Sequence, residues 1–117
     1  MKKERNWVIH AEHIVATIEK VERHRLLEKS TDPEIYQDAL YRNLATIGES
    51  ADELPEWLQE QYPHIPWRNI KDFRNVLVHN YLGDDIDRKI IDDVVINKLP
   101  ELRKAADDML NRYREGK

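Results

Sequence analysis

Apolar residues recur every three or four positions along most of the chain, and this spacing limits the fold more than any other feature of the sequence. The clearest run has spacings of four, three, four and three: Leu40, Leu44, Ile47, Ala51 and Leu54. Residues with this spacing lie on one face of an α-helix, whereas a half-buried strand would alternate apolar and polar residues. The sequence therefore predicts helices that each bury one face.

The first part of the chain should form two long helices. The first is expected from about residue 5 to residue 28, where apolar residues keep the helical period. Two start signals precede the second helix. Either Thr31 and Glu34 form a capping box, or Asp32 is the N-cap before Pro33 in the first turn. The sequence leaves these two alternatives open.

Prolines divide the middle of the chain. The second helix should end near Pro55, where a short third helix can open. An irregular connection should follow over residues 63–66, because two prolines three residues apart are incompatible with a regular helix. A fourth helix is then expected from about Trp67 to Tyr81, with Gly83 as its stop signal.

The rest of the chain should be one long helix that Pro100 kinks or splits. β-branched residues crowd positions 90–96, so a strand is an alternative there, although the period is helical. The predicted fold class is all-α. We expect a single domain over residues 1–117, built as an up-down bundle of four main helices plus one short helix.

Composition excludes several classes of protein. The chain has no cysteine, which rules out disulfides, thiolate zinc sites and thiol catalysis and fits a cytoplasmic protein. It has no apolar run of about 18 residues, and no apolar stretch follows its basic start, so neither a membrane span nor a signal peptide is expected. The net charge of −4 argues against an extended RNA-binding surface. A small nucleolytic cleft needs only a few local cations, so an acidic net charge is compatible with one.

The predicted fourth helix carries an unusual polar face. With Arg74 at zero on a helical wheel of about 100° per residue, Asn75 lies near 100°, His79 near 140° and Tyr81 near −20°. The opposite arc, from about 200° to 320°, should face the core and holds Val76, Phe73, Leu77 and Ile70. A guanidinium, an amide, an imidazole and a phenol on one face differ from the usual solvated surface of lysine and glutamate.

This set of side chains suits phosphate chemistry. Histidine can transfer protons near neutral pH, and arginine stays charged and can grip a phosphate with two donors. Asp72, Asp84 and Asp85 are poorly placed to hold Mg²⁺ together, so a metal-free reaction on RNA is the simpler interpretation. An ordinary surface arrangement of Arg74 and His79 is the alternative, since clustered polar residues mark functional sites only statistically.

Four segments in the same order resemble the HepT-like toxins of the HEPN superfamily. Arg74-x4-His79-x-Tyr81 is similar to the family signature Arg-x4-His-x-Tyr, with Asn75 as the polar residue after the arginine. The other similar segments are Tyr41 to Ser50 (family pattern Arg-Asn-Leu-x-x-Ile-Gly-Glu), Tyr62 to Arg68 (Tyr-Pro-x-Ile-Pro-Trp) and Leu99 to Leu102 (Leu-Pro-x-Leu). The resemblance covers most of the chain.

The resemblance implies a HEPN-type helical bundle that forms a homodimer with Arg74 and His79 of both protomers in one cleft. It also implies a toxin of a HEPN/MNT toxin–antitoxin system that cleaves RNA without a metal or cofactor, with tRNA or mRNA as candidate substrates. His79 would act as general acid and base, and Arg74 would stabilise the charged phosphorane, with Asn75 beside them. The partner would be an MNT-type nucleotidyltransferase antitoxin that adds AMP to Tyr81 and silences the cleft.

Further candidates have open alternatives. Gly48 interrupts a helical stripe, which close approach of another helix would explain better than a direct function. Glu49, Arg68 and Lys71 are candidate cleft residues, but each could equally be a surface residue. The rival to a ribonuclease is a non-catalytic helical module that dimerises or binds a nucleotide and partners a nucleotidyltransferase.

Histidines and tryptophans outside the signature are expected to be structural. His10 and His13 have a spacing compatible with metal ligation, but no third ligand follows at helical spacing, so no metal site is predicted. Trp7, Trp57 and Trp67 could stack RNA bases. Packing is favoured because they are separated and flanked by core-type residues.

Overall fold

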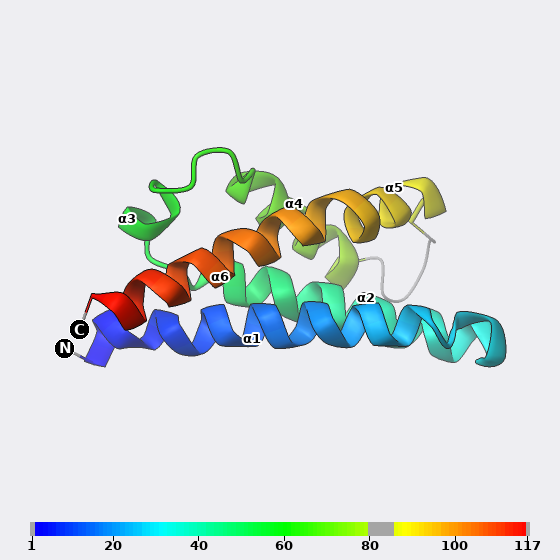
Figure 1. Cartoon of the computed structure of the whole chain (residues 1–117). Helices are drawn as coiled ribbons and strands as arrows, with labels where there is room; N and C mark the ends of the chain where they lie inside the picture. Colours follow the sequence, from blue (N-terminus) through cyan, green and yellow to red (C-terminus); the bar gives the residue numbers. More distant parts are fainter. Residues whose placement is uncertain (1, 80–85, 117) are drawn as a thin grey trace.

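The computed structural model describes residues 2–79 and 86–116, with side chains placed from residue 6 onward. Its long helices run alternately in opposite directions, so that the two ends of the chain meet at one end of the molecule (Figure 1). α1 spans Lys2–Arg25, α2 Pro33–Asp52, α4 Trp67–His79 and α6 Leu99–Glu115. The short α3 spans Glu56–Gln59. The predicted all-α, up-down architecture is confirmed.

The start of α2 decides between the two capping alternatives. The carboxylate of Asp32 accepts hydrogen bonds from the backbone N–H groups of Glu34, at 2.9 Å, and Ile35, at 3.3 Å, and Pro33 occupies the first turn. The hydroxyl of Thr31 instead donates to the carbonyl of Leu27 at 2.7 Å. Asp32 is therefore the N-cap, and the capping box between Thr31 and Glu34 does not form.

Two other boundaries differ from expectation. α1 ends at Arg25, and a separate 3₁₀ turn, η1 (Glu28–Ser30), replaces its predicted last turn. The last helix begins as α5 (Arg88–Asp93), widens into the π-helical segment η3 (Val94–Lys98) and continues as α6. Pro100 lies in the first turn of α6, where its missing N–H is tolerated. Residues 90–96 are helical, so the strand alternative was wrong.

The core lies between α1, α2 and α6, as the apolar stripes predict. α1 contributes Ile14, Ile18 and Val21, each at most 1% exposed, and every residue of the predicted α2 stripe is buried. α2 packs against both α1 and α4, and α1 packs against α6. Arg103 of α6 reinforces this last contact with ion pairs of 2.6 Å to Glu19 and 3.1 Å to Glu22.

Among the described residues, no helix is both long enough and apolar enough to span a lipid bilayer.

Candidate functional site

The start of α4 is held by the proline-rich connection that precedes it. The indole N–H of Trp67 lies within hydrogen-bond distance of the carbonyls of Gln59, at 3.0 Å, and Tyr62, at 3.1 Å. The Tyr62 hydroxyl donates to Asp108 of α6 at 2.7 Å. This segment therefore links α3, α4 and α6. Packing rather than base stacking explains Trp67, as the sequence indicated.

The other two tryptophans differ from each other. Trp7 is buried and meets the ring of Tyr113 edge-on, with centroids 5.5 Å apart. Trp57 is 50% exposed, so packing within the described chain does not account for it.

α2 and α4 approach each other closely where Gly48 faces Arg74. A Cβ atom built on Gly48 would lie 2.7 Å from Cβ and 2.9 Å from Cγ of Arg74, whereas carbon atoms in contact are usually about 3.5–4.0 Å apart. Any side chain at position 48 would force α4 away from α2. The expectation of a close helix approach at Gly48 is confirmed.

Arg74 is half-buried at this crossing. Its Nε is buried, and no hydrogen bond or ion pair to the guanidinium forms among the described residues. A buried donor without a partner costs about 1–3 kcal/mol, and an arginine in a folded protein usually finds a carboxylate or a carbonyl. The arrangement leaves a positive charge that no described residue neutralises.

Asn75 and His79 lie on the exposed part of α4, away from the α2 contact. The exposed face also carries two apolar side chains, Val76 at 43% and Val78 at 50% exposure. Within one chain the signature residues therefore differ in exposure. Arg74 lies at the edge of the buried face, and His79 faces outward.

The expectation that Val76 faces the core was wrong. α4 packs mainly on α2, which buries Leu77 and partly covers Ile70, Phe73 and Arg74. A helix that contacts the bundle on this side buries a narrow stripe, and Val76 lies beyond its edge.

The remaining cleft candidates are all on the surface. Lys71 lies 4.0 Å from Asp52 of α2 in a weak ion pair, and its side chain is 56% exposed. Glu49 and Arg68 are exposed. In the described part of the chain no hydrogen bond or ion pair connects any of them to Arg74 or His79.

Tyr81 and Gly83 fall outside the described residues, so the predicted modification site and the predicted stop of the fourth helix are not placed. The paired histidines of α1 are placed. His13 contacts the Thr17 hydroxyl at 3.3 Å, and no group of three metal-ligating side chains gathers within the described ranges.

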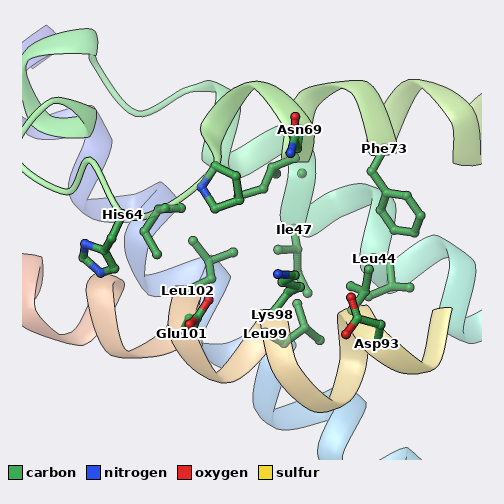
Figure 2. A pocket seen from close by; sticks show the side chains of 15 residues that line it. Leu44, Ile47, His64, Asn69, Phe73, Asp93, Lys98, Leu99, Glu101 and Leu102 are labelled. Atoms are coloured by element: carbon green, nitrogen blue, oxygen red, sulfur yellow. The ribbon is translucent and has the colours of Figure 1, made fainter. Parts of the chain in front are cut away.

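A cavity of about 590 Å³ opens between α2, α4 and the α5–η3–α6 helix, with Gly48 among its lining residues (Figure 2). Phe73 extends from α4 towards Leu44 of α2, Leu99 and Leu102 line the cavity from α6, and Asp93 and Lys98 provide charged groups at its lining (Figure 2). No sequence pattern predicted this cavity, because it depends on how far two helices that are distant in sequence stand apart.

The comparisons with known proteins show the family of the chain. The sequence model of the ribonuclease HepT-like family matches residues 11–109. The chain belongs to this family. HepT-like proteins are part of the HEPN superfamily, and the predicted family membership is confirmed.

Three relatives define the similarity. "Putative RNase MJ0127" of Methanocaldococcus jannaschii is 39% identical over 63% of this chain and 60% of its own length. "Gamma-glutamylcyclotransferase and putative RNase MJ0434" of the same organism is 31% identical over 82% of this chain and 44% of its own length. "Putative RNase TTE0752" of Caldanaerobacter subterraneus subsp. tengcongensis is 30% identical over 88% of this chain and 93% of its own length. The chain thus spans between two fifths and two thirds of the first two relatives. No solved structure matches it.

Proposed function

We propose that the protein is a metal-independent endoribonuclease and the toxin of a HEPN/MNT toxin–antitoxin system. The observation that carries the proposal is Arg74, a half-buried guanidinium without a partner in the described chain, on the same helix as an exposed imidazole, His79. Membership of the ribonuclease HepT-like family and relatives named as RNases support it.

In the proposed reaction the RNA supplies its own nucleophile. The 2′-oxygen attacks the adjacent phosphorus and loses its proton to a His79 imidazole. The bond from phosphorus to the 5′-oxygen breaks, and that oxygen takes a proton from a second imidazolium. The products are a 2′,3′-cyclic phosphate and a 5′-hydroxyl. Arg74 stabilises the extra negative charge of the phosphorane with charge-assisted hydrogen bonds, and Asn75 orients the phosphate.

The two imidazoles come from the two protomers of a homodimer in this proposal. Arg74 is half-buried and His79 is exposed, and one chain supplies only one signature imidazole, so in this proposal a second protomer completes the site. The exposed Val76 and Val78 provide apolar surface for such a contact. A two-fold axis would bring the same patch of each protomer together and place both pairs of signature residues in one cleft.

Silencing is proposed to occur at Tyr81. Its phenol oxygen attacks the α-phosphorus of ATP on a cognate MNT-type nucleotidyltransferase, and pyrophosphate leaves. The attached AMP then blocks the cleft, and its phosphate pairs with Arg74.

Cleavage of total tRNA in the presence of EDTA tests the catalytic proposal. We expect cleavage by the wild-type protein, products ending in a 2′,3′-cyclic phosphate, and a loss of about 10² to 10⁴ in rate for His79→Ala. Arg74→Ala should also lose activity. Since the stem of Arg74 packs on Gly48, Arg74→Met is the better variant, because it retains the stem and removes the charge.

Exposed His64 in the proline-rich connection offers a matched control. His64→Ala should cleave as fast as the wild type. Activity that EDTA abolishes and Mg²⁺ restores would contradict the mechanism. A folded protein that never cleaves RNA would favour the non-catalytic module.

A further inference from the structure

Gly48 lies on α2, opposite the side chain that we assign to phosphate binding. The atoms that would collide with a Cβ at position 48 are Cβ and Cγ of Arg74, and the next nearest is the backbone oxygen of Ile70 at 3.6 Å. The steric constraint at this helix crossing therefore falls on the base of the Arg74 side chain.

The collision could not be relieved by a flexible side-chain end. Cβ is bonded to the backbone of α4, so a contact of 2.7 Å can relax only if α4 shifts relative to α2. α2 and α4 form one of the main helix contacts of the fold, and a shift there would carry Arg74 with it. A displacement of about 1 Å at a catalytic group can reduce a rate about 10²-fold.

The buried Nε gives a second, independent sign that this side chain is held in place. With its stem against Gly48 and its Nε covered, Arg74 has little freedom at the first bonds of its side chain, so its position follows that of α4. Packing therefore restricts the Arg74 side chain, with no hydrogen bond or ion pair to the described residues.

We propose that Gly48 is a positioning residue for Arg74: its missing side chain sets the depth at which α4 lies on α2 and hence where the guanidinium meets the RNA phosphate. The importance of Gly48 for cleavage rests on the proposed ribonuclease function. The effect of Gly48 on the position of Arg74 does not depend on that function.

The test uses Gly48→Ala in the full-length protein, with Gly116→Ala as the matched control, since it adds the same methyl group near the C-terminus of α6 and far along the chain from α4. The first measurement is the ¹H–¹⁵N resonance of Arg74 Nε, assigned by its disappearance in Arg74→Lys. We expect this resonance to shift or exchange faster with solvent in Gly48→Ala and to stay unchanged in Gly116→Ala. An unmoved resonance in Gly48→Ala would overturn the proposal.

A second measurement asks whether the contact itself is responsible. Alanine is a better helix former than glycine, so Gly48→Ala should raise Tm in an Arg74→Gly background, where Cβ and Cγ are gone. In the wild-type background the collision should cancel or reverse this gain. An equal change of Tm in both backgrounds would show that the methyl group acts elsewhere, and would also overturn the proposal.

Cleavage of total tRNA provides the functional measurement. In Gly48→Ala the rate at saturating tRNA should fall about 10- to 100-fold, with a smaller change in the tRNA concentration that gives half the maximal rate. A loss of rate with an unmoved Arg74 resonance would count against positioning through Arg74. If even the wild type fails to cleave, the proposed function is wrong, while the resonance and the Tm comparison still decide the role of Gly48.

Discussion

At the scale of single residues, Arg74 is the side chain whose surroundings most need a function to explain them. A protein selected only for stability would gain from giving its buried Nε an acceptor or from replacing it with an apolar residue. Neither has occurred, and the neighbouring helix carries a glycine where Arg74 passes. The proposed phosphate-binding role of Arg74 would account for an arrangement that stability alone does not favour.

Tyr81 gives the prediction that belongs to this scale. Tyr81→Phe retains the ring but lacks the oxygen that would accept AMP. We expect the wild-type protein to gain AMP and lose activity when it is incubated with its cognate nucleotidyltransferase and ATP, whereas Tyr81→Phe should stay unmodified and active, as followed by mass spectrometry and growth arrest. Tyr113→Phe, which alters a tyrosine near the C-terminus, is the control and should be modified like the wild type. Equal silencing of Tyr81→Phe would refute the assignment.

The residues of the site were only partly predictable. Spacing and family resemblance indicated Arg74 and His79 as candidates, but a helical wheel does not say which arc meets the rest of the protein. The wheel assigned Val76 to the core and Arg74 to an open face. In the structure Val76 is 43% exposed, and Arg74 is half-buried with its Nε covered. Such errors arise because the orientation of a helix is set by its neighbours, which one sequence does not display.

At the scale of helices and their connections, Tyr62 makes a contact that the sequence did not suggest. Its hydroxyl bonds Asp108 across 46 residues of chain, and burial, then this hydrogen bond, raise the pKa of Tyr62 from 10.0 to about 12. The neutral phenol is thus favoured in the folded state. The stabilisation from the neutral Tyr62 phenol is fully present below about pH 10 and is lost as the pH rises towards about 12.

Tyr62→Phe should therefore destabilise the protein by about 1 kcal/mol, or about 4 °C in Tm, at neutral pH. The difference in Tm between this variant and the wild type should shrink as the pH rises through the window of about 10 to 12. Thermal unfolding followed by circular dichroism measures it. Asp108→Asn keeps an acceptor for the Tyr62 hydroxyl and should therefore lower Tm less than Tyr62→Phe does. If the loss of Tm in Tyr62→Phe were the same at every pH, the hydrogen bond would not be the cause of the destabilisation.

The helices themselves were well predicted where their signals are local. The apolar stripe of α2, the irregular connection before Trp67 and a capped start near Asp32 all follow from neighbouring residues. The π-helical segment Val94–Lys98 did not, although a disturbance near Pro100 was expected. A π-helical turn depends on how the long helix fits against the bundle, and many sequences with the same apolar period lack one.

At the scale of the whole molecule, the question is whether one chain can form a complete site. Cleavage as proposed needs a proton acceptor on one side of the phosphate and a proton donor on the other. One chain carries a single signature histidine, which is exposed, whereas Arg74 is half-buried. The net charge of −4 gives the whole chain no overall attraction for RNA, and a symmetric pair would double the cations at the proposed shared cleft.

Subunit mixing tests this directly. A His79→Ala homodimer should lose about 10² to 10⁴ in rate. A heterodimer of one wild-type chain and one His79→Ala chain, co-expressed with two affinity tags and purified through both, retains a single His79. We expect it to lose most of its activity as well, because the proposed reaction needs a second imidazole from the partner. If the site were formed within one chain, the wild-type chain would stay complete and the heterodimer would keep about half of the wild-type rate. A heterodimer with half the wild-type rate would therefore exclude a shared cleft, and a protein that is monomeric by light scattering at micromolar concentration would exclude it as well.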